Sequence, residues 1–194
     1  MDAAGTFTVR PDGGLFDPYP YLIRTIVYQQ LHGKAAATIY QRMLDLFGGE
    51  VPTPTQLMAT APELLRSAGL SGSKAAALID LAVQTDAGVL PTAAEIVGLS
   101  DLELVDRMTV VRGIGPWTVH MLLIFRLGRP DVLATGDFAV REGYRLMQGL
   151  AQQPTPTEYR ALTEHWRPYR SVASWYMYRA VDLHRAPRGG SAPE

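Results

Sequence analysis

Two glycines and a proline stand directly before a run of helix-forming residues in the stretch VVRGIGPWTVHMLLIF. A glycine adopts a positive φ at little cost and lets a ligand approach the backbone closely. N–H groups ahead of a helix N-terminus favour a negative charge, because the helix dipole points toward them. The helices 100–108 and 116–125 with the turn 111–115 therefore form a candidate device for gripping one DNA phosphate without reading sequence. Its candidate phosphate-binding residues are Gly113, Ile114, Gly115 and Thr118. The alternative is an ordinary packing corner between two helices.

The composition excludes several kinds of chemistry. The 194 residues include no cysteine. A disulfide framework, a cysteine nucleophile and a cysteine-ligated zinc or iron–sulfur site are therefore excluded. Hydrophobic residues make up 47% of the chain, which supports a buried core. No apolar run reaches about 18 residues and no signal pattern is present, so we expect a cytoplasmic protein without a membrane span.

The charges are divided unevenly along a chain whose formal net charge is −1. Residues 1–106 contain 6 Lys and Arg against 12 Asp and Glu, whereas residues 107–193 contain 12 Arg against 6 Asp and Glu. This asymmetry indicates that one part of the molecule meets an anion. Ala, Gly, Pro and Arg are all abundant, so genomic base composition accounts for part of the arginine excess.

The elements that must position these residues are helices, since helical periodicity runs through nearly the whole chain. Asp17 is a candidate N-cap and Pro18 stands at a first helical position. No segment has a convincing strand pattern, so we expect an all-α fold of about nine or ten helices. The other predicted helices cover 34–47, 73–87, 100–108, 116–125, 137–147, 157–166 and 168–184, and short helices are capped by Thr55 and Thr92.

The stretch GIGPWTVHMLLIFRLGRPDVLATGDFAVREG resembles the signature of the helix-hairpin-helix (HhH-GPD) DNA glycosylase superfamily. Three further segments resemble the same family in the same order: YLIRTIVYQQLHGKAAATI, LLRSAGLSGSKAAAL and HWRPYRSVASWYMYR. The resemblance is nearest to the 3-methyladenine DNA glycosylase II (AlkA-like) branch, which excises alkylated bases. It implies a two-lobed helical fold with a cleft between the lobes.

The resemblance also implies the domain boundaries. The glycosylase domain covers 17–185, with its hairpin at about 111–115. An extension of residues 1–16 precedes it, and the composition of 186–194 is typical of a disordered tail. The AlkA-type enzyme has an N-terminal sheet domain; since only about 16 residues precede Asp17, we expect a compact version without it. Aromatic candidates to replace the pocket wall of that domain are Phe16, Tyr19 and Tyr21.

The family couples its hairpin to a catalytic aspartate about 20 residues downstream, and Asp137 holds that position here. A carboxylate beside C1′ stabilises an oxocarbenium-like transition state and can orient or deprotonate water. Asp137 also begins a predicted helix, so it can serve as an N-cap with or without a catalytic role. Asp131 is the fallback carboxylate, although its loop position favours a turn residue.

Base flipping requires a residue that fills the gap in the duplex and a pocket that accepts the base. Alignment with the family places Gln30 at the wedge, with Gln29 and His32 beside it; the alternative is that these residues only cap helix ends. Aromatic rings bind a cationic alkylated purine by stacking and cation–π attraction. The candidate pocket residues are Trp117, Tyr178, Phe16, Tyr28, Trp175 and Met121, whereas Trp166 and Tyr169 are expected in the core.

Single residues distinguish the branches of the family. Members with lyase activity carry a lysine just after the hairpin glycines, and here that position is Trp117. No lysine follows Lys74, so a Schiff base is not available and the enzyme is expected to be monofunctional. Branches that carry an iron–sulfur cluster are disfavoured because cysteine is absent.

Other expectations follow from the resemblance. Hairpin carbonyls in this family commonly bind Na⁺ or K⁺, and the candidates here are Val110, Arg112 and Ile114. Ser171 and Arg170, at the start of the last helix, are candidates for a phosphate contact. No other cofactor is expected.

Together the residues and the resemblance predict a monomeric, monofunctional DNA glycosylase of the bacterial nucleoid. It would bind double-stranded DNA with damaged bases and excise bases of the 3-methyladenine or 7-methylguanine type in base excision repair. The alternatives are a non-catalytic protein that binds lesions through the same hairpin, or a glycosylase for a different lesion. An all-α interaction domain unrelated to DNA is disfavoured by the basic half and the four ordered motifs.

Overall fold

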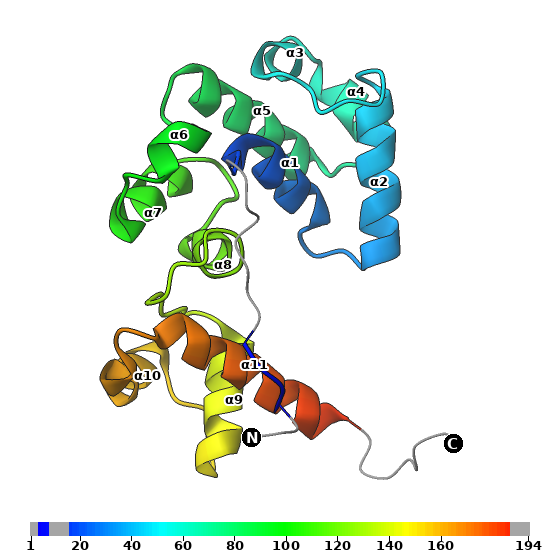
Figure 1. The fold of residues 1–194 in the computed structure, drawn as a ribbon. Coiled ribbons are helices and arrows are strands. Elements are labelled where there is room, and N and C mark those ends of the chain that lie inside the picture. Colours follow the sequence, from blue (N-terminus) through cyan, green and yellow to red (C-terminus); the bar gives the residue numbers. More distant parts are fainter. Residues whose placement is uncertain (1–3, 8–15, 187–194) are drawn as a thin grey trace. The chain divides into compact units, whose positions relative to one another are not determined.

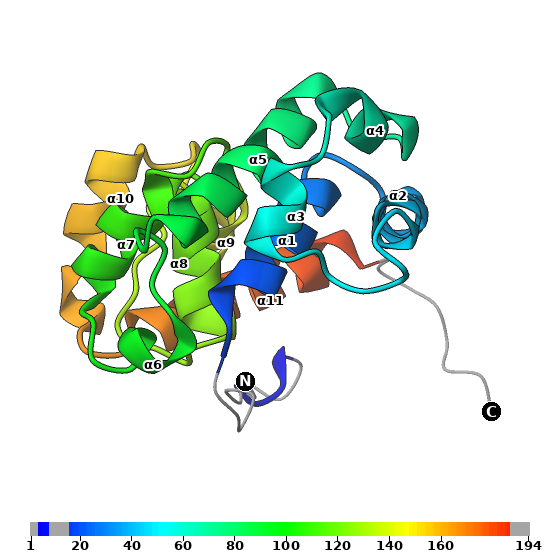
Figure 2. The ribbon, with the colours of Figure 1, turned by 90° about the horizontal axis from the view of Figure 1, so that it is seen from above.

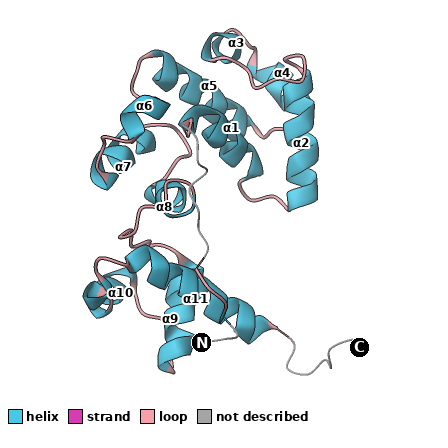
Figure 3. Ribbon diagram, viewed as in Figure 1, coloured by secondary structure: helices cyan, strands magenta, loops and turns pink. Residues whose placement is uncertain are grey.

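The computed structural model describes residues 4–7 and 16–186, and its regular structure in those ranges is helical without a strand (Figure 3). The predicted all-α class is confirmed. None of the described helices is long and apolar enough to cross a membrane. The helices are α1 (Pro18–Tyr28), α2 (Gly33–Asp45), α3 (Pro54–Met58), α4 (Pro62–Ser67), α5 (Gly72–Asp86), α6 (Ala93–Ile96), α7 (Asp101–Thr109), α8 (Pro116–Phe125), α9 (Phe138–Gln148), α10 (Pro156–Leu162), the 3₁₀ helix η2 (Glu164–Trp166) and α11 (Arg170–Arg185) (Figure 1).

The chain divides into two compact units. Gly14–Val119 forms one, and Met1–Gly13 with His120–Glu194 forms the other. This division agrees with the two lobes that the resemblance implies, whereas the cleft stays a prediction. Most of the predicted extension 1–16 and nearly all of the predicted tail 186–194 lie outside the described residues.

Several helix N-termini lie where their capping residues predict. The side chain of Asp17 accepts a hydrogen bond from Tyr19 N at 3.0 Å, and Pro18 follows at the first helical position. Thr92 and Ser100 each form a capping box with the glutamate three residues later. These caps satisfy N–H groups that have no partner inside the helix.

Three starts differ from their predicted positions by two residues. The caps of α3 and α5 are Thr53 and Ser71, not Thr55 and Ser73. Thr53 is favoured because a proline follows it at the first helical position and Gln56 completes a capping box. The last helix begins at Arg170, two residues after Pro168.

Helix α5 is the central element of the unit Gly14–Val119. It packs against α1, α3 and α4 (Figure 1, Figure 2). The helical spacing of α1 presents one wholly buried face, made of Leu22, Ile23, Ile26 and Val27. Burial of such side chains stabilises the unit by about 1.5–3 kcal/mol each. The positions of both ends of α1 are therefore fixed by its packing on α5.

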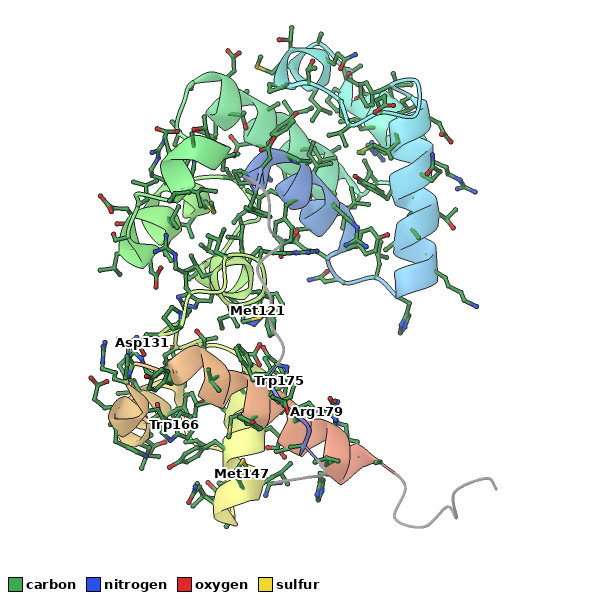
Figure 4. The ribbon with its side chains drawn as sticks, viewed as in Figure 1. Met121, Asp131, Met147, Trp166, Trp175 and Arg179 are labelled. Carbon is green, nitrogen blue, oxygen red and sulfur yellow. The ribbon has the colours of Figure 1, made fainter. Side chains whose placement is uncertain are left out.

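In the other unit, α9 crosses α11 so closely that the crossing admits only glycine. A Cβ added at Gly143 would lie 2.7 Å from Met177 Cα and would overlap the Met177 carbonyl group. The core around this crossing consists of Val140, Tyr144, Tyr159 and Met177, with Trp166 packed against it. The core position predicted for Trp166 is confirmed (Figure 4). The same prediction for Tyr169 was wrong: it precedes α11 and is 64% exposed.

Candidate functional site

The turn between α7 and α8, residues 111–115 (the hairpin), is closed by its own backbone and by α5. Ile114 N donates to Val111 O at 3.0 Å. Arg112 N donates to Asp80 Oδ2 at 2.6 Å. Ile114 is buried, so this residue anchors the hairpin in the core of its unit. The hairpin is therefore a fixed structure rather than a loose connection.

Phosphate binding by the hairpin glycines stays a prediction, and one positive φ and two available N–H donors are consistent with it. Gly113 has a φ of +80°, a conformation that side chains disfavour. No atom lies within 4 Å of a Cβ built on Gly115, which leaves its backbone open to a ligand. Within the described residues, no acceptor is bonded to the N–H of Gly113 or Gly115. Both N–H groups thus remain for an anion, while Thr118 is buried one turn further on.

The turn Tyr28–Leu31 (the wedge turn) joins α1 to α2 and carries the predicted wedge residue. Gln29 has φ −51° and ψ 132°, Gln30 has φ 58°, and Leu31 N donates to Tyr28 O at 3.3 Å. These values describe a type II turn, whose third position normally holds glycine or asparagine. The Gln30 side chain is exposed at this position.

Gln29 and His32 do stand at helix ends, as the C-cap of α1 and the N-cap of α2, but neither side chain makes a capping bond. His32 precedes α2 but makes no side-chain capping bond. Gln29 Nε2 instead donates to Gly113 O at 2.9 Å and so joins the wedge turn to the hairpin. The wedge role of Gln30 stays a prediction, and its exposed side chain is consistent with it.

In the other unit, Asp137 is the N-cap of α9 and is only 5% exposed. Its Oδ1 accepts the N–H of Val140 at 2.9 Å, and its Oδ2 accepts the hydroxyl of Tyr178 at 2.7 Å. Each carboxylate oxygen therefore has a donor that fixes its direction. The predicted capping role is confirmed, and the second bond shows that Asp137 has a partner beyond its own helix.

Tyr178 reaches Asp137 from α11 and keeps its proton over the physiological range. Burial raises the pKa of Tyr178 well above its ordinary value, and the hydrogen bond to Asp137 raises this pKa further. The hydroxyl also lies 3.3 Å from Met121 Sδ, and the ring centroid lies 6.0 Å from that of Phe125. Tyr178, Met121 and Asp137 are thus brought together by three helix segments that are far apart in the sequence.

Asp131, the fallback carboxylate, is held by two arginines. Arg170 Nε donates to its Oδ1 at 2.6 Å, and Arg167 contributes an ion pair at 3.1 Å. The hydrogen bonds from Arg170 hold the pKa of Asp131 below its ordinary value. The residue therefore fastens the loop before α9 to the start of α11, as a turn residue would.

Ser171 and Arg170 have protein partners in the places where a phosphate contact was expected. Ser171 is 1% exposed; its Oγ donates to Arg129 O at 2.6 Å and accepts the N–H of Val132 at 2.9 Å. Arg170 is engaged by Asp131 through its backbone and its guanidinium group. A phosphate contact by either residue stays a prediction, and it requires an exchange of partners.

The candidate pocket aromatics of the unit Gly14–Val119 differ in how much ring surface is covered. Trp117, in the first turn of α8, is 50% exposed. The guanidinium carbon of Arg24 lies 4.0 Å from the ring centroid of Tyr28, so one face of this ring already binds a cation. Phe16 contacts Tyr21 edge to face at 5.4 Å. Trp117 therefore presents more ring surface than Tyr28 does.

Trp175 lies on α11 one turn before Arg179 (Figure 4). Its ring contacts Phe7 at 5.8 Å and Tyr176 at 5.0 Å, both edge to face. Arg179 Nε donates to Ala4 O at 3.0 Å, so the described residues of the N-terminal segment are fastened to the same face of α11. Trp175 has a structural role here, and its predicted place in a base pocket stays untested.

The sequence did not reveal which side chains hold the predicted site residues in place. It predicted Tyr178 for its ring, yet the hydroxyl contacts Asp137, and it gave no role to Asp80 or Lys74. A half-buried tyrosine usually bonds its hydroxyl to a partner, which was an available signal. The identity of that partner was not available, because it lies 41 positions away in the sequence.

Comparison with known proteins connects this geometry to a family. The sequence model of the family described as HhH-GPD superfamily base excision DNA repair protein matches residues 23–168. DNA-3-methyladenine glycosylase 1 of Schizosaccharomyces pombe is 39% identical over 168 residues, which cover 86% of this chain and 74% of that protein.

Two solved structures are similar over most of both chains. The S. pombe 3-methyladenine DNA glycosylase in complex with abasic DNA has a TM-score of 0.77 and 37% identity, covering 92% of this chain and 87% of that one. A DNA-3-methyladenine glycosidase from Bacillus halodurans has a TM-score of 0.82 and 31% identity, covering 94% and 82%.

Proposed function

Because the chain belongs to the HhH-GPD superfamily of base excision DNA repair proteins, we propose that it is a monofunctional DNA glycosylase for alkylated bases. It flips bases of the 3-methyladenine or 7-methylguanine type out of duplex DNA and hydrolyses the N-glycosidic bond. The observation that carries this proposal is the buried Asp137 carboxylate, which Val140 N–H and the Tyr178 hydroxyl hold in one orientation. The names of the relatives support the choice of alkylated purines.

The proposed reaction depends on charge at the sugar. An alkylated purine is cationic, so it leaves with the electrons of the C1′–N bond and needs little help from an acid. Positive charge then develops on C1′ and the ring oxygen, and a preorganised carboxylate stabilises it. Water adds to C1′ from the open face and gives its proton to Asp137 or to solvent. The sugar keeps its hydroxyl, and the product is an abasic site.

Trp117 supports hydrolysis over a lyase reaction. A lyase of this family needs an amine after the hairpin glycines, and the indole of Trp117 cannot form a Schiff base. Its half-exposed ring instead offers a stacking surface for the flipped base. Water is then the nucleophile, and the DNA strand stays intact after the base has left.

The hairpin would bind one phosphate through the N–H groups of Gly113 and Gly115, and a Na⁺ or K⁺ ion through its carbonyls. The donor set fits such an ion, because the carbonyl oxygens of Val110, Arg112 and Ile114 accept no hydrogen bond from the described residues. A monovalent cation there would add positive charge beside the phosphate. We propose that the protein acts on chromosomal DNA, in the nucleoid of a bacterial cell.

The deciding experiment is single-turnover excision from duplexes that each contain one defined lesion. We expect release of 3-methyladenine and 7-methylguanine, intact strands until alkali is added, and no protein–DNA adduct after borohydride treatment. Lesion-specific binding without release of any base would show the non-catalytic alternative to be right. A borohydride-trapped adduct would contradict the monofunctional assignment.

A further inference from the structure

Helix α5 contacts both DNA-facing turns of the unit Gly14–Val119. Near its N-terminus, Lys74 Nζ donates to Val27 O and Gln29 O at 2.7 Å each, at the entry to the wedge turn. Asp80, under two helical turns further along, accepts Arg112 N–H at 2.6 Å and so holds the hairpin. The single helix α5 therefore contacts both the wedge turn and the hairpin.

The two turns are also bonded directly to each other. Gln29 Nε2 donates to Gly113 O at 2.9 Å, although the two residues are 84 positions apart. A Cβ built on Gly113 would lie 3.6 Å from Ala77 Cβ, so the hairpin also rests on α5 between its two polar contacts. These contacts form a closed ring: α5 to the wedge turn, the wedge turn to the hairpin, and the hairpin back to α5.

The position of Lys74 is costly to maintain. Burial lowers the pKa of its ammonium group, because the charge loses water. The two carbonyls at the end of α1 offset this cost, since they lack partners within the helix and carry the negative end of its dipole. Through its bond to Gln29 O, Lys74 also holds the residue directly before Gln30.

We propose that Lys74 and Gln29 position the wedge turn relative to the hairpin, which Asp80 holds on the same helix, so that phosphate binding and gap filling act at a fixed spacing. Lys74 is a positioning residue that acts through Gln29 and Gln30 and touches no DNA itself. The proposal rests on the proposed function, because it takes DNA with a flipped or missing base as the ligand. A displaced wedge costs most where the duplex opposes opening.

The test compares binding to two duplexes that differ at one position. One contains a tetrahydrofuran analogue of an abasic site and the other is intact. Lys74→Met keeps the aliphatic stem and removes the donor. Arg66→Met removes the same charge from an exposed position on α4 in the same unit and serves as the control. Thermal melting accompanies every variant.

We expect Lys74→Met to lower the preference for the abasic duplex by on the order of tenfold, the effect of losing one or two hydrogen bonds. Its affinity for the intact duplex should match that of Arg66→Met. In a Gln30→Ala background, Lys74→Met should cause no further loss of preference, because both changes remove the same function. Additive losses, or an equal loss on both duplexes, would overturn the proposal.

A third variant, Asp80→Ala, tests the contact between α5 and the hairpin. It frees the Arg112 N–H and leaves Lys74 in place, so affinity should fall on both duplexes alike. If Lys74→Met does not fold, Gln29→Leu removes the bond between the turns and must show the same loss of preference. Neither measurement needs base excision, so an inactive protein with the predicted binding pattern would refute the proposed function and leave this proposal standing.

Discussion

At the scale of a single side chain, Asp137 combines an observed structural role with the chemical role proposed for it. As the cap of α9 it accepts Val140 N–H, which fixes the carboxylate without reducing its charge. As the acceptor of the Tyr178 hydroxyl it is tied to a second helix. A group held from two directions needs little reorganisation when charge develops beside it, and this preorganisation is what stabilises a cationic transition state.

Replacement of Asp137 by Asn should separate helix capping from the proposed stabilisation of charge at C1′. Asn still caps a helix, so the melting temperature should change little. It offers no negative charge to C1′, so single-turnover excision of 7-methylguanine should fall by about a hundredfold or more. Near-normal excision with an unchanged melt would remove Asp137 from the mechanism. A collapsed melt would show that its main contribution is to the fold.

Tyr178→Phe tests the hydroxyl apart from the ring. The phenylalanine ring can fill the same space, while Asp137 Oδ2 loses its donor. We expect excision to slow by about tenfold or more, the effect of one hydrogen bond to a charged group. Lesion affinity should hold, since the ring remains. If affinity falls and the excision rate does not, the role of Tyr178 lies in the base pocket and not in the orientation of Asp137.

At the scale of elements, the crossing of α9 and α11 sets the distance between Asp137 and Tyr178. The crossing is close because Gly143 has no side chain to separate the backbones. Asp137 begins α9 and Tyr178 lies on α11 next to Met177, so a shift at the crossing changes their 2.7 Å bond directly. A glycine inside a helix thus controls the geometry of Asp137, the proposed catalytic residue.

Gly143→Ala should destabilise the protein, although alanine is the better helix former by about 1 kcal/mol. The added Cβ would overlap Met177 backbone, and overpacking of this kind costs about 1–3 kcal/mol or more. Thermal melting is the measurement, with Gly136→Ala as the control, since no atom lies within 4 Å of a Cβ there. An increase in melting temperature for Gly143→Ala would contradict the described packing.

Asp131 should make the attachment of α11 depend on pH. Its pKa is lowered in the folded state, so its contribution to stability is present above the unfolded value near 3.9 and is lost as pH falls through the lower folded value. Asp131→Asn should cost about 1–3 kcal/mol at pH 7 and much less at about pH 2. Denaturant unfolding at the two pH values checks this, with the exposed Glu50→Gln as control. A pH-independent difference would show that shape, not charge, is what the site needs.

Features that depend on residues close together in the sequence could be predicted, and contacts between distant segments could not. Asp17, Thr92 and Ser100 were found because a cap acts within three residues of its helix. Thr55 and Ser73 were wrong because two hydroxyl residues stood near each start, and the choice depended on the neighbouring Pro54 and Gly72. The contacts of Lys74, Asp80 and Tyr178 join distant segments, so no spacing rule could have predicted them.

For the whole molecule, affinity for DNA should depend on local charge and not on the net charge of −1. The hairpin offers backbone N–H groups, which read no base, so we expect salt-sensitive binding with little sequence preference. Gly115→Val should lower affinity equally on unrelated duplexes, because the new side chain would occupy the open space beside the N–H groups. Titrations at several salt concentrations on two sequences provide the measurement. Unchanged affinity would mean that the hairpin is not the anchor.

The left-handed backbone of Gln30 has a consequence for attempts to improve the protein. A positive φ in a residue with a side chain costs about 1 kcal/mol, so glycine is the more stable choice at this turn. Selection for thermal stability alone would therefore favour Gln30→Gly, because this change raises the free energy of unfolding. Stabilising changes at functional positions often reduce activity in this way. Because Gln30 is the predicted wedge residue, an engineered library should keep position 30 fixed.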